Sequence, residues 1–172
     1  MHEEASAPAY RIRLATQADI PTLVAMINSA FAIEEFLEGT RTDADRLAEE
    51  MKKGKILLLE DPLGALLASV YAEERGDHGY LGMLAVSPTA QGLGLARRLV
   101  EAVEERFRNA GLAAIEISVL SLRPELLPIY RRYGFVETGV EPFLFPRTFK
   151  DSKDAVGCHC IVLRKPLRFS TP

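Results

Sequence analysis

The sequence predicts an α/β protein in which helices flank a mixed β-sheet. Apolar segments with the two-residue alternation of strands are interleaved with segments whose apolar residues recur every three to four positions, as in helices. Hydrophobic residues make up 48% of the 172 residues and charged residues 26%, which are ordinary values for a globular protein. A chain of this length buries roughly 70% of its unfolded surface. We therefore expect a single domain over 1–172, with its core at about 10–167.

The N-terminal half of the chain is expected to form a strand, two helices and two further strands. Thr16 and Asp19 are capping residues before a helical pattern, and Asp43 and Gly54 are the cap and the stop of the next one. The sequence Asp-Pro-Leu-Gly at 61–64 is typical of a hairpin connection. The expected elements are a strand at 10–15, a helix from about 20 to 31–36, a helix at 43–54, and strands at 55–61 and 64–75.

The C-terminal half is expected to alternate strand, helix, strand and helix before two last strands. Its longest helical pattern is closed by Gly111, and its apolar stripe consists of Leu95, Leu99, Val103 and Phe107. Residues 141–155 contain prolines and show no clear period, which indicates a loop. The expected elements are a strand at 79–86, a helix at about 92–110, a strand at 113–120, a short helix at 124–133, and strands at 134–140 and 157–167. The complete order is βααβββαβαββ.

The charge distribution argues against nucleic acids and membranes as partners. The formal net charge is −3, and the 21 basic and 24 acidic residues are scattered in short pairs, so we expect no broadly cationic face. No apolar run approaches the ~18 residues of a membrane span. The first ten residues are acidic and lack the apolar core of a signal peptide, so we expect a cytoplasmic protein.

The two cysteines, Cys158 and Cys160, flank His159 in the last predicted strand, where residues two apart share a face. We interpret them as two buried or half-buried thiols. The other histidines, His2 and His78, show no spacing that indicates a shared metal shell. We therefore expect no metal site.

The segment 84–103, LAVSPTAQGLGLARRLVEAV, places a glycine-containing turn between a strand and a helix. Such a turn leaves backbone N–H groups pointing at one spot, where the helix N-terminus adds partial positive charge and glycines let an anion approach. The turn therefore predicts a phosphate site, to which Arg97 adds a charged contact. A dinucleotide fingerprint fits poorly, because Arg97 stands at its third glycine, and the Gly-Lys-Ser/Thr of a P-loop is absent. A turn needed only for close helix-strand packing is the remaining alternative.

Two motifs in the chain resemble those of the GNAT acyltransferases. Gln91-Gly92-Leu93-Gly94-Leu95-Ala96 matches the family's pyrophosphate-binding signature Q/R-x-x-G-x-G/A, and Tyr130, Gly134 and Phe135 match its Y-x-x-x-G-F segment. The order of elements is also that of the family, so the resemblance covers about residues 10–167. It implies the GNAT N-acyltransferase fold, with a mostly antiparallel central sheet that splays between its fourth and fifth strands.

The resemblance also implies an N-acetyltransferase that uses acetyl-CoA as cosubstrate, needs no metal, and lets a primary amine of a small molecule or protein attack the thioester directly. The pantetheine arm would pair with the backbone of Leu84 and Val86, and an N–H near Leu84 or Ala85 would face the thioester oxygen. Tyr130 is the expected catalytic residue, because a phenol with a pKa of about 10 is protonated at pH 7 and can donate to the departing thiolate. The expected cofactor-binding residues are Leu84, Ala85, Val86, Gln91, Gly92, Leu93, Gly94, Leu95, Ala96, Arg97, Arg123 and Tyr133. The expected substrate-binding residues are Phe31, Glu34, Glu35 and Tyr80.

Two departures from the family pattern leave roles open. Arg123 stands where many members have an asparagine that meets the cofactor, and it can reach cofactor phosphate or substrate. Tyr80 and Gly82 stand where many members carry a Glu or His base. Glu34 and Glu35 are explained equally well as a solvated helix end. The candidates for the base are Glu34, Glu35, Asp77, His78, Glu116 and a chain of water molecules.

The absence of a base on the fourth predicted strand keeps a second function open, a GNAT-like module that binds acyl-CoA as a sensor without turnover. A third alternative is a structural homologue whose glycine turn binds nothing. The acceptor also stays open, because similar compositions serve antibiotics, polyamines, amino acids and protein N-termini in this family. A homodimer is compatible with the sequence, since exposed last strands often pair between subunits in the family.

Overall fold

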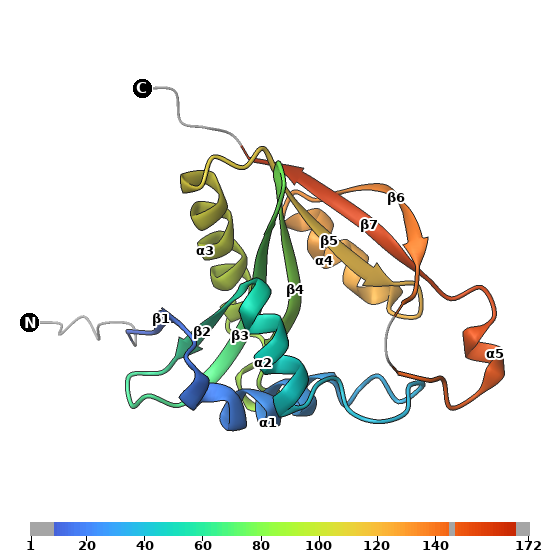
Figure 1. Ribbon diagram of the computed structural model, residues 1–172, viewed down its shortest axis with the longest axis horizontal. Coiled ribbons are helices and arrows are strands. Elements are labelled where there is room, and N and C mark those ends of the chain that lie inside the picture. The colour runs from blue at the N-terminus through green and yellow to red at the C-terminus, as the bar shows by residue number, and fades with distance from the viewer. Residues whose placement is uncertain (1–8, 145–146, 168–172) are drawn as a thin grey trace, which may run out of the picture.

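The computed structural model describes residues 9–144 and 147–167, which form one sheet of seven strands with helices on both faces (Figure 1). The strand order is β1-β2-β3-β4-β5-β7-β6, with β4 and β5 parallel and all other neighbours antiparallel. The strands are β1 (Arg11–Leu14), β2 (Lys55–Glu60), β3 (Leu66–Arg75), β4 (His78–Val86), β5 (Ala114–Leu120), β6 (Val136–Pro142) and β7 (His159–Pro166). The predicted α/β fold with a mostly antiparallel sheet is confirmed. The expectations for residues 1–8 and for Pro146 lie outside the described residues.

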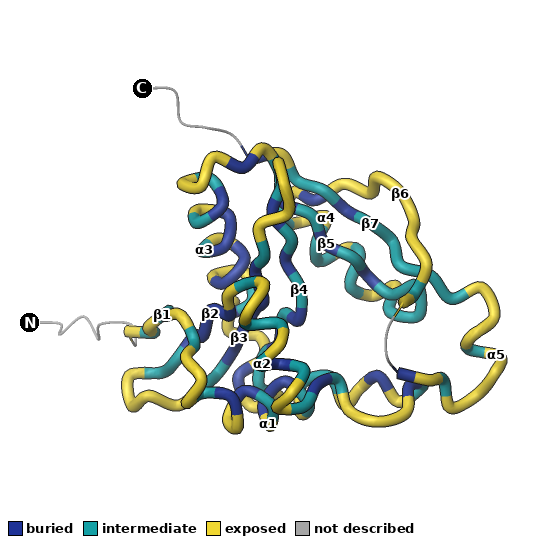
Figure 2. Tube along the Cα trace, viewed as in Figure 1, coloured by how far each residue is buried: buried dark blue, intermediate teal, exposed yellow. Residues whose placement is uncertain are grey.

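The helices divide the core into two clusters, one on each face of the sheet. Helices α3 and α4 cover the face that we call the α3 face, and α1 and α2 cover the opposite one, the α1 face. Figure 2 shows the buried stripes of α1 and α3 against the sheet, whereas β6 is exposed along its length. The helices are α1 (Ile20–Phe31), α2 (Ala44–Lys53), α3 (Leu95–Asn109), α4 (Leu127–Arg132) and α5 (Ser152–Ala155). Single 3-10 turns stand at η1 (Gln17–Asp19), η2 (Pro88–Ala90) and η3 (Pro124–Leu126).

Two stretches differ from the sequence prediction. Helix α3 begins at Leu95 rather than at 92, because Gly92 and Gly94 have positive φ values of 80° and 73°, which a right-handed helix cannot contain. The segment 141–155, which was predicted to be a loop, contributes the end of β6 and the short helix α5, whose N-terminus is capped by the Asp151 carboxylate. A helix of four residues is too short to leave a period in the sequence.

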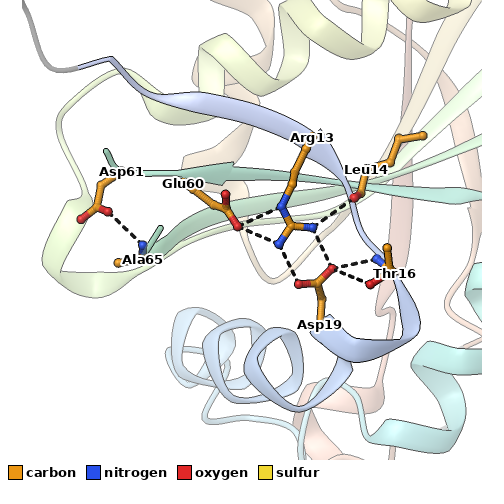
Figure 3. A network of polar contacts seen from close by, with 7 residues as sticks. All are labelled: Arg13, Leu14, Thr16, Asp19, Glu60, Asp61 and Ala65. Carbon is orange, nitrogen blue, oxygen red and sulfur yellow. Dashed lines mark hydrogen bonds and ion pairs between the residues drawn. The ribbon is translucent and has the colours of Figure 1, made fainter. Parts of the chain in front are cut away.

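Arg13 on β1 ties the start of α1 to the sheet (Figure 3). Its guanidinium donates to both oxygens of Asp19 at 2.7 and 2.8 Å, and twice to Oε1 of Glu60 on β2 at 2.7 and 3.0 Å. Asp19 also accepts the backbone N–H of Thr16 at 2.7 Å, so the two predicted capping residues form a capping box. The hydrogen bonds from Arg13 hold the pKa of the Asp19 carboxyl well below its usual range.

Asp19→Asn should lower the free energy of unfolding at pH 7 by about 1–2 kcal/mol, because it removes charge-assisted hydrogen bonds at a partly exposed site. A carboxyl whose pKa is lowered on folding adds stability above its unfolded pKa of about 4, and that contribution is lost as the pH falls toward the folded value. The difference between wild type and variant should therefore shrink from pH 7 to pH 3. Urea unfolding at each pH measures it.

The control for this comparison is Glu105→Gln, which neutralises an exposed carboxylate on α3. We expect its unfolding to match that of the wild type. A difference between wild type and Asp19→Asn that stays constant down to pH 3 would show that the Asp19 charge is not the source of the stability.

Candidate active site

Strands β4 and β5 pair at only three positions, His78–Tyr80 with Ala114–Glu116, and then diverge (Figure 1). Beyond this point β4 still pairs with β3, and β5 still pairs with β7. No strand of the described chain lies between the facing edges of β4 and β5. The N–H of Ser87 donates to β3, so by alternation the backbone groups of Leu84 and Val86 point to the open edge. The predicted splay between the fourth and fifth strands is confirmed.

A bulge in β4 lies beside this opening. Met83 has a φ of 46°, which is uncommon for a residue other than glycine, and the pairing with β3 shifts register between Ser69 and Tyr71. The bulge reverses the alternation of side chains, since Leu81 packs into the core on the α3 face and both Met83 and Ala85 pack into the core on the α1 face. Because a bulge bends its strand, this one contributes to the divergence of β4 from β5.

The glycines of the turn after β4 serve its backbone conformation rather than close packing. A Cβ atom on Gly92 or Gly94 would meet no atom within 4 Å. The close approach of α3 to the sheet is made instead at Gly79, where a Cβ would lie 2.3 Å from the ring of Phe107. This geometry argues against the alternative in which the turn exists only for helix-strand packing.

The same turn presents a run of free backbone donors. From Gly92 to Arg97, no backbone N–H donates to an acceptor in the described part of the chain, and the first helical bond runs from Arg98 N to Gly94 O at 3.2 Å. Unpaired donors at a helix N-terminus favour an anion, and the space beside Gly92 and Gly94 is open, since a Cβ built on either meets no atom within 4 Å. Around these donors Gln91, Leu93 and Arg97 are exposed, Ala96 is half-buried and Leu95 is buried in the core.

Tyr130 lies on α4, next to the opening on the α3 face. Its ring packs edge-to-face against Tyr133 and Phe135, with centroid distances of 6.2 and 5.9 Å. Burial raises the pKa of Tyr130, with smaller contributions from Tyr133 and Tyr80. The phenol is therefore neutral at pH 7 and keeps a proton that it can donate.

Lys165 on β7 joins α4 to α3. Its ammonium donates to the carbonyl oxygen of Tyr133, just after α4, at 2.7 Å, and to Oε1 of Glu104 on α3 at 2.8 Å. Glu104 is only 7% exposed, so water screens this ion pair weakly. The helix that follows the glycine turn and the helix that carries Tyr130 are thereby fixed to one another.

Tyr80 approaches the opening from the α1 face. The Arg75 guanidinium lies 3.8 Å from the centre of its ring, and a Cβ on Gly82 would lie 2.8 Å from a ring atom, so the ring lies over Gly82. Burial raises the pKa of Tyr80, and the Tyr80 phenol in turn contributes to the raised pKa of Tyr130. Tyr80 belongs to the core on the α1 face and Tyr130 to the core on the α3 face, so the two phenols lie on opposite faces of the sheet.

Glu34 is buried between two arginines from distant parts of the chain. Its carboxylate lies 3.1 Å from Arg123 and 3.4 Å from Arg147, and Glu34 and Arg147 are each 8% exposed. Arg147 also donates to the carbonyl oxygens of Glu38 and Gly39 at 3.1 and 3.2 Å. Two residues predicted for different roles, Arg123 for the cofactor and Glu34 for the substrate, thus meet in one ion network. Arg147 was missed because its segment shows no period.

These contacts join two loops into a wall below the opening. The N–H of Lys150 donates to the carbonyl oxygen of Phe36 at 3.0 Å, and Leu37 and Phe149 form an isolated bridge. In Figure 1 the chain after α1 runs across beneath the opening and meets the chain that precedes α5. We call the paired segments 34–41 and 147–150 the loop wall.

The other predicted residues take different positions. Glu35 is exposed after the end of α1, and Phe31 lies beneath the guanidinium of Arg41, whose centre is 5.2 Å from the ring centroid. His78 pairs with Asp77 at 3.0 Å where β4 and β5 are still joined. The Asp77–His78 pair therefore lies at the closed end, away from the open edge of β4.

Cys158 and Cys160 are free thiols of intermediate exposure, and burial raises the pKa of Cys160 to about 11. Among residues 9–144 and 147–167, no group of three or more His, Cys, Asp and Glu side chains is arranged to hold a metal ion. In the same described ranges, no helix has the length and apolar character needed to cross a membrane.

A family model described as acetyltransferase (GNAT) domain matches residues 24–144, which is more than half of the chain. The chain belongs to the GNAT family. The match includes the opening between β4 and β5, the glycine turn and Tyr130.

Other similar proteins agree with this assignment. The IAA acetyltransferase of Azospirillum brasilense is 31% identical over 71 residues, which are 41% of this chain and 46% of that protein, so the match spans about half of the relative. The ribosomal-protein-S18-alanine N-acetyltransferase of Escherichia coli superposes with a TM-score of 0.73 at 18% identity, over 95% of this chain and 97% of that one. The Salmonella typhimurium protein yncA, with its cofactor acetyl-CoA, superposes with a TM-score of 0.70 at 19% identity, over 95% and 97%. At these identities the structures establish the fold.

Glu34→Gln should open the loop wall, because two largely buried guanidinium groups lose the carboxylate between them. Removing one partner of a buried ion pair costs about 3–5 kcal/mol, and most of this loss should appear as local opening, since the loops can separate without unfolding the sheet. Hydrogen exchange in residues 36–41 and 147–150 should accelerate at least about tenfold. The amides of α3 should keep their protection.

Glu35→Gln changes the exposed neighbour of Glu34 and is the matched control, for which we expect wild-type exchange. Unchanged exchange of the loop wall in Glu34→Gln would show that the ion network does not hold the two loops together.

Proposed function

We propose that the protein is an N-acetyltransferase that moves an acetyl group from acetyl-CoA to a primary amine of a small molecule or protein. The observation that carries the proposal is the run of free N–H donors from Gly92 to Arg97, which follows directly on the open edge of β4. A pyrophosphate held at the turn would continue into an extended arm along that edge. Coenzyme A has this shape, with a pyrophosphate at one end of a pantetheine arm.

The residues around the opening fit acetyl-CoA in their chemistry. The backbone amides of Gly92, Gly94 and Ala96, with the side chains of Gln91 and Arg97, would hold the pyrophosphate. The backbone groups of Leu84 and Val86 would pair with the amides of the pantetheine arm. When bound, acetyl-CoA supplies the acetyl group as a thioester.

Two groups of this chain would then act on the reaction. Of the two proposed N–H donors, that of Leu84 faces the open edge, whereas alternation points that of Ala85 toward β3. The Leu84 N–H would stabilise negative charge on the carbonyl oxygen. Tyr130 would protonate the departing sulfur, while Tyr133 packs against its ring.

The acceptor would bind on the other side, between β4 and the loop wall. Tyr80 and Phe31 would contact it, whereas Glu34 and Arg123 would shape its walls through their ion pair rather than bind it. Glu35 is exposed and would contact a large acceptor only at the rim.

One observation favours a second function, an acyl-CoA sensor without turnover. Gly82 and Tyr80 leave the α1 face of β4 without a carboxylate, and the ring of Tyr80 fills the space over Gly82. A sensor would keep the phosphate site and lack a group that removes the proton of the amine.

An amine screen with acetyl-CoA separates the two functions. Release of the coenzyme A thiol is followed with spermidine, kanamycin, methionine and a peptide with a free N-terminal alanine as acceptors. Thiol release that depends on one of the amines supports the transferase, and acetyl-CoA binding without release supports the sensor. Absence of any thermal stabilisation by acetyl-CoA contradicts both.

Gly94→Glu should abolish acetyl-CoA binding. Position 94 requires a φ of 73°, and a glutamate there would set a carboxylate against the pyrophosphate. Because backbone groups carry the recognition, Gln91→Ala and Arg97→Ala should weaken binding by only about 1.5–3 kcal/mol, the value of a hydrogen bond to a charged group. Calorimetric titration with acetyl-CoA measures all three variants, with circular dichroism to verify that each is folded. Wild-type affinity in folded Gly94→Glu would remove the main support for the proposal.

Tyr130→Phe should lower kcat by about 10²–10⁴-fold with little change in acetyl-CoA affinity, because it removes a proton donor and keeps the packed ring. Tyr133→Phe is the control, as it keeps the neighbouring ring and should retain wild-type kcat. Single-turnover kinetics with the amine found in the screen isolate the chemical step. An unchanged rate for that step in Tyr130→Phe would exclude Tyr130 as the acid.

A further inference from the structure

One face of the sheet leaves the opening between β4 and β5 accessible to the acceptor. Tyr130 belongs to the core on the α3 face, which α3 and α4 cover, and Tyr80 belongs to the core on the α1 face. On the α1 face, α1 and α2 pack against β2, β3 and β4, whereas β5, β7 and β6 carry half-buried and exposed side chains there. The amine therefore enters on the α1 face, and its proton has to leave on that face.

Strand pairing places side chains of three strands around this entrance. Tyr80 pairs with Glu116, so Ser118, two residues further along β5, lies on the same face just beyond the last paired position. Cys160 on β7 and Glu141 on β6, which pair with one another, also lie on this face. The charge of Glu141 and the thiol of Cys160 both act on the pKa of Tyr80, which agrees with this placement.

Ser118 and Glu141 are joined by a hydrogen bond. Ser118 Oγ donates to Glu141 Oε1 at 2.5 Å, the short limit for a hydroxyl bound to a carboxylate. Ser118 is half-buried beside the opening, and Glu141 is exposed at the edge of the sheet. A proton that reaches Glu141 can therefore pass on to water.

The other carboxylates near the opening are engaged elsewhere. Glu34 lies between two arginines, and Asp77 lies at the closed end of the splay. Glu116 shares the face of Ser118, but it faces Arg164 at 3.8 Å and still pairs through its backbone with β4. Glu141 differs from them because its one bonded partner in the described chain is a neutral hydroxyl that borders the opening.

We propose that Glu141, acting through Ser118, accepts the proton of the attacking amine, an inference that rests on the proposed acetyltransferase function. As the nitrogen forms its bond to the acetyl carbon and the carbon–sulfur bond breaks, Ser118 Oγ takes one proton from the nitrogen and passes its own to Glu141. Tyr130 protonates the sulfur from the α3 face. Glu141 then releases its proton to water, and Tyr130 regains one from water. Ser118 is the catalytic residue of this relay, and Glu141 is the residue that positions its hydroxyl and receives the proton.

Four charged or titratable groups of the described chain surround the relay. They are Tyr80 on β4, Glu116 on β5, and Cys160 and Arg164 on β7. Burial, with a smaller contribution from Glu141, raises the pKa of Cys160 to about 11, and burial raises the pKa of Tyr80, so both are neutral at pH 7. Neither of them is therefore a base at pH 7 that competes with Glu141 for the proton.

Three single variants and one double variant test the relay. Glu141→Gln and Ser118→Ala remove its two parts, and Glu137→Gln changes a carboxylate on the same strand that pairs with Arg131. The values of kcat/KM are measured from pH 6 to pH 9 with the best alkylamine of the screen and with hydroxylamine. The ammonium form of an alkylamine first releases one proton to water, and the nitrogen then holds the proton that it must lose during attack strongly. The less basic nitrogen of hydroxylamine loses that proton more easily and depends less on a base.

We expect Glu141→Gln and Ser118→Ala each to lower kcat/KM for the alkylamine about 100-fold at pH 7, and to lower it less than about tenfold for hydroxylamine. The double variant should be no slower than either single one, because both substitutions break the same relay. Glu137→Gln should match the wild type. Acetyl-CoA affinity by calorimetry and the melting temperature should stay at the wild-type values in all four.

An equal loss for both amines, or a loss together with weakened acetyl-CoA binding, would mark a structural role and overturn the proposal. Wild-type rates in Glu141→Gln would overturn it as well. If the wild type binds acetyl-CoA but releases no thiol with any amine, the acetyltransferase function fails and the relay fails with it. That outcome is distinct, because it already shows in the unmodified protein.

Discussion

The short parallel pairing between β4 and β5 is the constraint on which the rest of the molecule depends. Three residue pairs hold the two parts of the sheet together, and beyond them two strand edges face each other with backbone groups that no strand of the described chain satisfies. An interior sheet edge left in this state is costly unless water or a ligand pairs with it. The bulge at Met83 maintains the divergence by bending β4. The glycine turn, Tyr130 and Tyr80 are all arranged around the gap that results.

Local patterns predicted the elements and the glycine turn between β4 and α3, because their signals lie within a few residues of one another. The stripe of Leu95, Leu99, Val103 and Phe107 is buried as predicted, and the splay followed from the family resemblance. The bulge could not be predicted, since a methionine carries no turn signal. The contact of Glu34 with Arg147 joins residues 113 positions apart and depends on how two loops fold back, which no periodicity records. The hydrogen bond from Ser118 to Glu141 could not be predicted either, because it depends on the register of three strands.

The ion network of the loop wall is better explained by specificity than by stability. Removing two arginines and a glutamate from water is expensive, and well-packed apolar residues often stabilise such a position as much or more. A charged network, however, is satisfied by one arrangement of partners, whereas apolar loops can slide. Arg123 in the β5–α4 connection and Arg147 in the chain after β6 both pair with Glu34, which follows α1. The network therefore specifies that these three segments meet beside the opening.

The bridge that Lys165 makes between Glu104 and the carbonyl of Tyr133 fixes the position of α3 relative to α4. The bridge thereby sets the distance from the glycine turn at the start of α3 to the phenol of Tyr130 on α4. Because both helices are fastened to the same ammonium group, the distance from the proposed phosphate site to the proposed acid is fixed. A donor whose arm is shorter or longer than that distance would bind at the turn and still present its sulfur out of reach of the proton. In the proposed acetyltransferase, thioesters would thus be selected partly by the length of the donor, at a point far from the acyl group itself.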